Sequence, residues 1–162
     1  KLTRSKNMIY SYKYDTEIGT ITLSESNGSI LELSFKKIEI SDNYVIQETT
    51  LLHNASIQLK EYFLGYRKDF SLPLNPIGTP FQKKVWETLL LIPYGETRSY
   101  KEIAILMGNP KACRAIGMAN NKNPISLFIP CHRVIGSNGK LVGYGGGLNV
   151  KKHLLDLESN NI

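Results

Sequence analysis

The feature that most constrains this fold is a change of hydrophobic periodicity across a proline-rich segment, residues 73–80. Before it, in residues 10–14 and 31–35, apolar side chains recur at every second position, which is the period of a half-buried strand. After it, apolar side chains recur three or four positions apart between glycines and prolines, which is typical of short helices. We therefore predict an α+β protein with two domains, residues 1–75 and residues 76–162.

The N-terminal domain is predicted to be a small antiparallel sheet with a covering helix. About three strands are expected, and Asn27-Gly28 between two of them is a strong signal for a tight turn. A later segment has the spacing of a helix with one apolar face, formed by Leu52, Ala55, Leu59, Tyr62 and Phe63. That face would pack on one side of the sheet.

The C-terminal domain is predicted to be mostly helical, because the ends of its helices are marked in the sequence. Thr79 and Gln82 form a capping box around a first-turn proline. Ser99 and Glu102 form a second capping box, and Gly108 should end the helix that this box opens.

A further helix should begin at Asn109-Pro110 and end at about Asn120, which completes a helix-turn-helix pattern. Arg114 is the main long charged side chain along its middle. Small or unbranched side chains occupy many of its other positions, at Ala112, Ala115, Gly117, Met118 and Ala119. Base readout in the major groove usually uses several long polar side chains. We therefore expect close, largely sequence-independent DNA contact, with minor-groove insertion of Arg114 left open.

The net charge of +6 is unevenly placed along the chain. Residues 1–82 hold nine basic and nine acidic side chains, whereas residues 83–122 hold seven basic and three acidic ones. A local excess of positive charge suggests an anionic partner, most often nucleic acid. A solvated helix face is the alternative interpretation.

Cysteine and histidine usage predicts neither a disulfide framework nor a metal site. The chain has two cysteines, Cys113 and Cys131, and its histidines are scattered at His53, His132 and His153. A structural zinc site needs about four ligands at recognisable spacing. We expect no metal and no cofactor, a buried structural Cys113, and His53 and His153 at the surface.

The chain is also predicted to be intracellular and free of membrane contact. Its apolar runs fall short of the roughly 18 residues that span a bilayer. Residues 1–6 are basic but lack the apolar core of a signal peptide. We expect a cytoplasmic protein, or a nuclear one if the source is a eukaryote.

The run Pro-Cys-His-Arg-Val at residues 130–134 is the strongest chemical signal in the chain. The thiolate is the nucleophilic form of cysteine, and a nearby base or positive charge lowers a thiol pKa from about 8.5. Taken alone, the pair Cys131-His132 favours a buried structural cysteine, because free cysteine is among the most buried residue types. The rest of the chain favours a reactive one.

Two further segments occur around this run. Residues 108–112 read Gly-Asn-Pro-Lys-Ala, and residues 143–148 read Gly-Tyr-Gly-Gly-Gly-Leu. The glycines of the second segment match no phosphate-binding fingerprint. They indicate either a plain surface loop or a wall where backbone approaches a flat ligand.

With these three motifs in order, the chain closely resembles the O6-alkylguanine-DNA alkyltransferases, also called methylated-DNA–protein-cysteine methyltransferases. The resemblance is strong over residues 80–158 and rests on layout over residues 1–79. It implies direct repair of O6-alkylguanine in double-stranded DNA by a monomer. The damaged nucleotide would be flipped out of the duplex, and its alkyl group would move irreversibly to the protein's cysteine.

The resemblance also implies roles for individual residues. Cys131 would accept the alkyl group, His132 would take its proton through a water molecule, and Glu158 would polarise the imidazole. Asn123 would brace the active-site turn, and Tyr100 would donate to the departing guanine. Taken alone, Tyr100 is more simply an exposed helix-start residue and Glu158 a solvated carboxylate, whereas their joint occurrence in register favours the functional roles.

Other residues would hold the substrate. Arg114 would enter the base stack, the carbonyls of Cys131 and Val134 would accept from the guanine amino group, and Lys151 would lie near the sulfur. The full set expected around the base is Ser126, Val134, Tyr144, Gly145, Gly146 and Lys151. The set expected on DNA is Lys111, Ala112, Arg114, Ala115 and Gly117.

Two positions depart from the pattern of some family members. Gly145 replaces a serine whose hydroxyl can bond the guanine oxygen, so only its backbone amide remains. Ser126 replaces proline or a bulkier residue beside the alkyl pocket. These two differences leave open whether larger alkyl groups and benzylated inhibitors are accepted.

Three other functions fit the residues less well. A non-enzymatic protein that binds alkylated DNA and recruits repair factors would lack the acceptor cysteine, whereas Cys131 is present. A cysteine hydrolase would need a distant histidine and an oxyanion hole. A transcription regulator would need base readout, which the alanine-lined helix does not favour.

Overall fold

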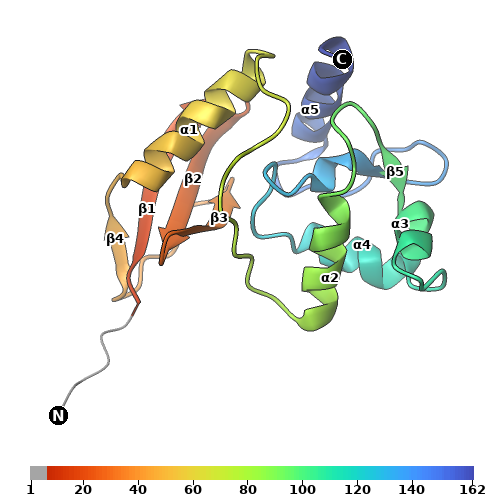
Figure 1. The fold of residues 1–162 in the computed structure, drawn as a ribbon, viewed down its shortest axis with the longest axis horizontal. Helices are drawn as coiled ribbons and strands as arrows, with labels where there is room; N and C mark the ends of the chain where they lie inside the picture. Colours follow the sequence, from red (N-terminus) through yellow and green to blue (C-terminus); the bar gives the residue numbers. More distant parts are fainter. Residues whose placement is uncertain (1–6) are drawn as a thin grey trace.

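The computed structural model describes residues 7–162. Figure 1 shows a sheet with one helix on it, followed by a group of helices joined to it by an extended connector. The sheet half contains β1 (Ile9–Thr16), β2 (Gly19–Ser26), β3 (Ser29–Ser34), β4 (Tyr44–Ile46) and α1 (Thr50–Phe63). The other half contains α2 (Pro80–Leu89), β5 (Arg98–Ser99), α3 (Tyr100–Leu106), α4 (Cys113–Asn121), the 3₁₀ turn η1 (Cys131–Arg133), β6 (Val134–Ile135) and α5 (Leu148–Asn160). The predicted α+β class is confirmed.

The sheet has four strands in the order β3-β2-β1-β4. Strands β1, β2 and β3 pair antiparallel, as predicted, and Asn27 and Gly28 both adopt positive φ in the turn between β2 and β3. The short strand β4 pairs parallel with β1, so the expectation of a purely antiparallel sheet is wrong at this edge. Three residues are too few to show an alternating pattern, and their pairing is fixed by the chain's return to the edge of β1.

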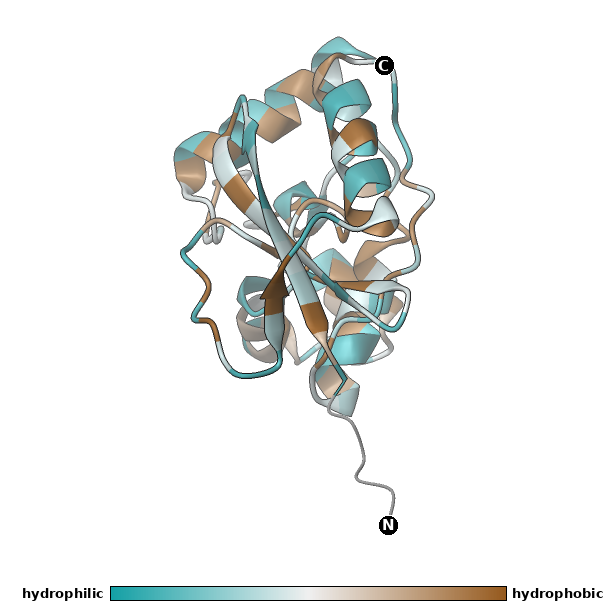
Figure 2. Ribbon diagram, turned by 90° about the vertical axis from the view of Figure 1, so that its left-hand side faces the viewer, coloured by the Kyte–Doolittle hydropathy of each residue, from teal (hydrophilic) through white to brown (hydrophobic). Residues whose placement is uncertain are grey.

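Helix α1 covers one face of the sheet (Figure 1). Four of the five residues predicted from its spacing are buried, whereas Phe63 is only half-buried. Thr49 caps it by accepting from the amide of Leu52 at 3.2 Å, and the Thr49 hydroxyl donates to Glu25 at 2.8 Å. In Figure 2 each strand carries short hydrophobic segments between hydrophilic ones, which fits a sheet buried on part of its surface.

The predicted helix starts in the C-terminal half are confirmed where they depend on capping boxes. The Thr79 hydroxyl accepts from the Gln82 amide at 3.1 Å, and the Gln82 side chain accepts from the Thr79 amide at 2.9 Å. Ser99 and Glu102 make the same reciprocal pair at 3.0 Å each. Gly108 follows the end of α3 with a φ of 75°.

Helix α4 starts at Cys113, three residues later than the predicted start at Pro110. The amide of Ala112 donates to the carbonyl of Asn109 at 3.0 Å, which closes a separate turn before the helix begins. Helix α5 has 13 residues and is the last helix of the described chain.

One hydrophobic core runs through both halves of the described chain. Phe70 of the connector packs edge-to-face on Phe128, and the amide of Leu33 in β3 donates to the carbonyl of Pro124 at 3.0 Å. The domain boundary at residues 75 and 76 stays a prediction. Within residues 7–162, no helix combines the length and apolarity needed to cross a membrane.

Candidate active site

Cys131 is the first residue of η1 and lies at the end of a tightly bent segment. Leu127 adopts a left-handed backbone with a φ of 76°, which is strained for a residue with a side chain. Asn123 holds both sides of this bend: its side-chain amide donates to the carbonyl of Ile129 at 2.9 Å, and its oxygen accepts from the amide of Ile125 at 3.0 Å. The expected bracing position of Asn123 is therefore the one observed.

The Cys131 thiol is buried, with 4% of the residue exposed. Burial raises the pKa of this thiol, while hydrogen bonds from Asn123 and Ser126 and the charge of Lys151 act in the opposite direction. The resting form is therefore the neutral thiol, and nucleophilic attack requires a base.

His132 and Glu158 form a buried pair next to this thiol. His132 Nε2 lies 2.7 Å from Glu158 Oε2, and both side chains are at most 1% exposed. Burial lowers the pKa of His132, although the Glu158 carboxylate opposes this shift. With Nε2 directed at the carboxylate, Nδ1 carries the free lone pair, and it has no hydrogen-bond partner among residues 7–162.

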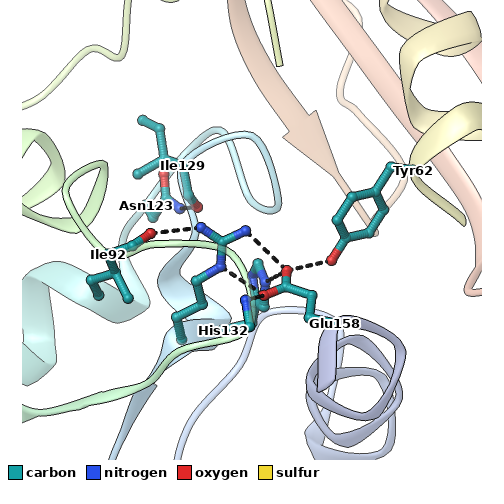
Figure 3. A network of polar contacts seen from close by, with 8 residues as sticks. Tyr62, Ile92, Asn123, Ile129, His132 and Glu158 are labelled. Atoms are coloured by element: carbon teal, nitrogen blue, oxygen red, sulfur yellow. Dashed lines mark hydrogen bonds and ion pairs between the residues drawn. The ribbon is translucent and has the colours of Figure 1, made fainter. Parts of the chain in front are cut away.

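Glu158 is the centre of a larger network, drawn in Figure 3. Arg133 donates through Nε to Oε1 at 2.8 Å and through Nη2 to Oε2 at 3.1 Å. The Tyr62 hydroxyl donates to Oε2 at 2.6 Å, and the Gly95 amide donates to Oε1 at 3.2 Å. Burial alone would raise the Glu158 pKa, but hydrogen bonds and charges from His132 and Arg133 lower it to about 2.

The interpretation of Glu158 as a solvated carboxylate is therefore wrong, and two of its partners were missed. Arg133 belongs to the motif that the sequence singled out, and a buried arginine needs a carboxylate partner. Tyr62 was expected only as a core residue of a helix. A buried tyrosine needs a partner for its hydroxyl, which is the signal that was available, but no local pattern identifies that partner 96 residues away.

Lys151 links helix α5 to the glycine-rich segment 136–147. Its ammonium group donates to the carbonyls of Val134 at 2.6 Å, Val142 at 2.8 Å and Gly143 at 3.5 Å. Burial lowers the pKa of Lys151 to about 8, opposed by its interaction with Cys131. The charge of Lys151 acts on the Cys131 thiol, and its role beside the sulfur stays a prediction.

The other residues expected around the base are Ser126, Tyr144, Gly145 and Gly146. The Tyr144 ring packs edge-on to His132 at 6.5 Å between centroids, and its buried hydroxyl has no partner within the described chain. A Cβ built on Gly145 would lie 4.0 Å from the Ser126 hydroxyl. A Cβ built on Gly146 would lie 3.0 Å from the Phe35 ring, so a side chain here would require that ring to shift.

The carbonyls of Cys131 and Val134 already have donors. Asn120 donates to the carbonyl of Cys131 at 3.3 Å, a contact that the sequence did not predict, and Lys151 donates to that of Val134. Each carbonyl oxygen retains a second lone pair. Both can therefore still accept from a ligand.

The residues expected to contact DNA lie on or just before α4. Lys111, Arg114 and Ala115 are exposed, and Ala112 and Gly117 are half-buried. Gly117 faces the ring of Tyr100, where a built Cβ would lie 3.7 Å from a ring carbon.

Tyr100 begins α3 and is half-buried, and burial raises its pKa. Its hydroxyl lies 3.5 Å from the carbonyl of Val142, the carbonyl that also binds Lys151. Helix α3 and the glycine-rich segment therefore meet at this hydroxyl.

The remaining cysteine and histidines lie outside the site. Cys113, expected to be buried, is half-exposed because it begins α4, and its thiol contacts the carbonyl of Pro110 at 3.9 Å. His53 and His153 are exposed, as predicted. Within residues 7–162, no three histidine, cysteine or acidic side chains are grouped to hold a metal ion.

Comparison with known proteins gives concordant results for both halves of the chain. Residues 80–160 match the family described as 6-O-methylguanine DNA methyltransferase, DNA binding domain. Residues 8–76 match the family described as 6-O-methylguanine DNA methyltransferase, ribonuclease-like domain.

Individual relatives match over nearly their whole length. The methylated-DNA–protein-cysteine methyltransferase of Methanosarcina barkeri is 50% identical over 152 residues, which is 91% of this chain and 96% of the relative. The constitutive methylated-DNA–protein-cysteine methyltransferase of Bacillus subtilis is 46% identical over 158 residues, which is 93% of this chain and 96% of the relative. The crystal structure of Mycobacterium tuberculosis OGT in complex with DNA aligns with a TM-score of 0.87 at 43% identity, covering 94% of each chain.

Proposed function

Because the chain belongs to the 6-O-methylguanine DNA methyltransferase family, we propose that Cys131 is the residue that receives the alkyl group. The predicted activity is the family's: DNA repair by alkyl transfer to a protein cysteine. One observation carries the assignment. Cys131 lies beside a buried histidine whose Nε2 binds Glu158 and whose Nδ1 has no partner in the described part of the chain.

The reaction begins with removal of the thiol proton. His132 is neutral at rest, so Nδ1 takes this proton through a water molecule, and Glu158 stabilises the imidazolium that forms. Lys151 offsets the negative charge of the thiolate. A base, a carboxylate and a cation thus act on one sulfur in a site from which bulk water is excluded.

The thiolate then attacks the alkyl carbon on the side opposite the C–O bond. The sulfur electron pair forms the S–C bond, and the electrons of the C–O bond pass to O6 of the guanine. The Tyr100 hydroxyl donates a hydrogen bond to the departing base and stabilises its negative charge. The product is a thioether, which offers no good leaving group, so each molecule acts once.

The damaged base must leave the duplex to react. Cys131 is almost fully buried, so an O6-alkylguanine stacked in DNA cannot present its alkyl carbon to the sulfur. We propose that the flipped base binds between the 123–134 bend and the glycine-rich segment. Its contacts there are Ser126, Val134, Tyr144, Gly145, Gly146 and Lys151.

Helix α4 supplies the DNA contacts in this proposal. Lys111 attracts the phosphate backbone, and the small residues Ala112, Ala115 and Gly117 allow close approach. Arg114 is exposed and enters the stack in place of the flipped nucleotide, which offsets part of the unstacking cost of a few kcal/mol. The protein acts as a monomer and uses no cofactor.

Arg114→Ala is expected to slow repair of duplex O6-methylguanine by about 10- to 100-fold, because loss of the filler leaves a few kcal/mol of unstacking uncompensated. Single-turnover rates should be measured on the duplex and on a single strand with the same lesion, where no unstacking is needed. Lys60→Ala removes the same charge from an exposed position on α1 and should leave both rates unchanged. An equal loss on both substrates would contradict the filler role.

The proposed function is tested by titrating a duplex containing one O6-methylguanine with increasing protein and counting the lesions that remain. Repair should rise linearly and stop at one lesion per protein molecule, and an undamaged guanine should not react. Tight binding without loss of the lesion would instead indicate a damage-recognition protein. Continued turnover would exclude the single-use mechanism.

A further inference from the structure

We propose that Tyr62 is a positioning residue for the transfer reaction: its hydroxyl fixes the Glu158 carboxylate that in turn holds His132. Tyr62 lies on α1, within the sheet half of the chain, whereas the reacting residues all come from the other half. The inference rests on the proposed function and extends it to a part of the fold that contacts neither the thiol nor, as proposed, the DNA.

Three donors meet at one oxygen of this carboxylate, and one of them is Arg133 Nη2 at 3.1 Å. The Tyr62 hydroxyl lies 2.6 Å from Glu158 Oε2, and His132 Nε2 lies 2.7 Å from the same atom. Figure 3 shows the Tyr62 hydroxyl directed at the Glu158 carboxylate. Both Tyr62 and His132 are fully buried, so bulk water cannot take the place of either donor.

The shared oxygen links the tyrosine to the histidine electrostatically. A carboxylate oxygen that accepts a hydrogen bond from a hydroxyl has less negative charge available for an imidazolium on its other side. Removal of the hydroxyl should therefore strengthen the attraction between Glu158 and protonated His132. The neutral imidazole, which the reaction needs as its base, would then form only at higher pH.

The environment of His132 makes Glu158 the partner through which such an effect acts. The titratable and charged groups around the ring are Glu158 and Lys151 on α5, Cys131 and Arg133 on either side in the chain, and Tyr144 in the glycine-rich segment. Glu158 favours the protonated ring, whereas Arg133 and Lys151 disfavour it. A change in the charge density of Glu158 is therefore felt directly by His132.

Tyr62→Phe removes the hydroxyl and keeps the ring, which packs on Phe63, Phe70 and Tyr94. Tyr94→Phe is the matched control, because Tyr94 contacts the Tyr62 ring and its own hydroxyl has no hydrogen-bond partner among the described residues. Both variants lose one oxygen from the same aromatic cluster. They differ in whether that oxygen contacts Glu158.

The test is the pH dependence of the single-turnover rate on duplex O6-methylguanine, together with the pKa of His132 from NMR titration of its ring in the DNA-free protein. In Tyr62→Phe, the midpoint of the acid limb and the His132 pKa should both rise by about 0.5–1 unit. The rate below the midpoint should fall by about 3- to 10-fold, and the rate on the high-pH plateau should be retained. Tyr94→Phe should match the wild-type protein in both measurements.

Two results would overturn the proposal. One is an unchanged midpoint and an unchanged His132 pKa in Tyr62→Phe. The other is a uniform rate loss at every pH together with a lower melting temperature, which would mark Tyr62 as a purely structural residue. If the wild-type protein transfers no methyl group, the proposed function fails, and the NMR titration still decides whether Tyr62 acts on His132.

Discussion

Replacing Glu158 with glutamine is expected to slow methyl transfer by about 10²- to 10³-fold, the scale of a lost general base, because a neutral amide beside His132 cannot stabilise an imidazolium. It is also expected to lower the free energy of unfolding by about 3–5 kcal/mol, because Arg133 would be left as a buried charge without its carboxylate. Single-turnover kinetics and urea unfolding at pH 7 measure the two effects.

The same variant should remove an acid-dependent part of the stability. The pKa of Glu158 is about 2 in the folded protein and about 4.3 in an unfolded chain, so its carboxylate contributes fully above about pH 5. This contribution is lost as the pH falls through 4 toward 2. The stability difference between wild type and Glu158→Gln should therefore shrink over that window.

Glu61→Gln provides the control for both measurements. Glu61 pairs with Arg67 at 2.9 Å at the surface, where such pairs contribute at most about 1 kcal/mol. Glu61→Gln should change neither the rate of methyl transfer nor the pH dependence of the free energy of unfolding. A Glu158→Gln variant that transfers methyl groups at the wild-type rate would contradict the role given to the His132–Glu158 pair.

Lys151→Met is expected to slow transfer by about 10- to 100-fold, because an opposite charge near a buried thiolate lowers its pKa by one unit or more. Methionine retains the apolar length of the side chain but offers no donor to the carbonyls of Val134 and Val142. The rate should be followed against pH, since the variant needs a higher pH to form the same fraction of thiolate.

Lys152→Met is the matched control for this prediction. Lys152 is the next residue, its side chain is 68% exposed, and it pairs with Asp156 one turn further along α5. The substitution removes the same charge without touching the site, so the rate on a short duplex should stay within about twofold of wild type at moderate salt. Equal rate losses in the two lysine variants would show that the loss of net charge, and not the loss of the Lys151 ammonium group at the site, slows the transfer.

Features set by near neighbours in the chain were predictable from sequence. The capping boxes at Thr79 and Ser99 depend on residues three positions apart, so they mark the starts of α2 and α3 directly. The start of α4 was predicted from Asn109-Pro110 without a capping box, and it was misplaced. Pro110 is favoured in a first helical turn, but a turn closed between Asn109 and Ala112 delays the helix to Cys113.

Contacts between distant segments were not predictable in the same way. Cys131, His132 and Glu158 were assigned through resemblance to a family, and the structure brings them together. The hydroxyl of Tyr62 meets Glu158 across 96 positions, and helical periodicity reports only that this tyrosine faces the core. Lys151 donates its hydrogen bonds to backbone carbonyls. Because every residue carries such a carbonyl, no side-chain pattern predicts these contacts.

Alkyl transfer to Cys131 is tested most directly by the intact mass and peptide map of the protein after incubation with a duplex carrying one O6-methylguanine. A gain of one methyl group, located on Cys131, is expected, with no gain in Cys131→Ser. The half-exposed Cys113 serves as an internal control and should stay unmodified. Tight binding of the duplex with no change in mass, or a methyl group on Cys113, would contradict alkyl transfer to Cys131.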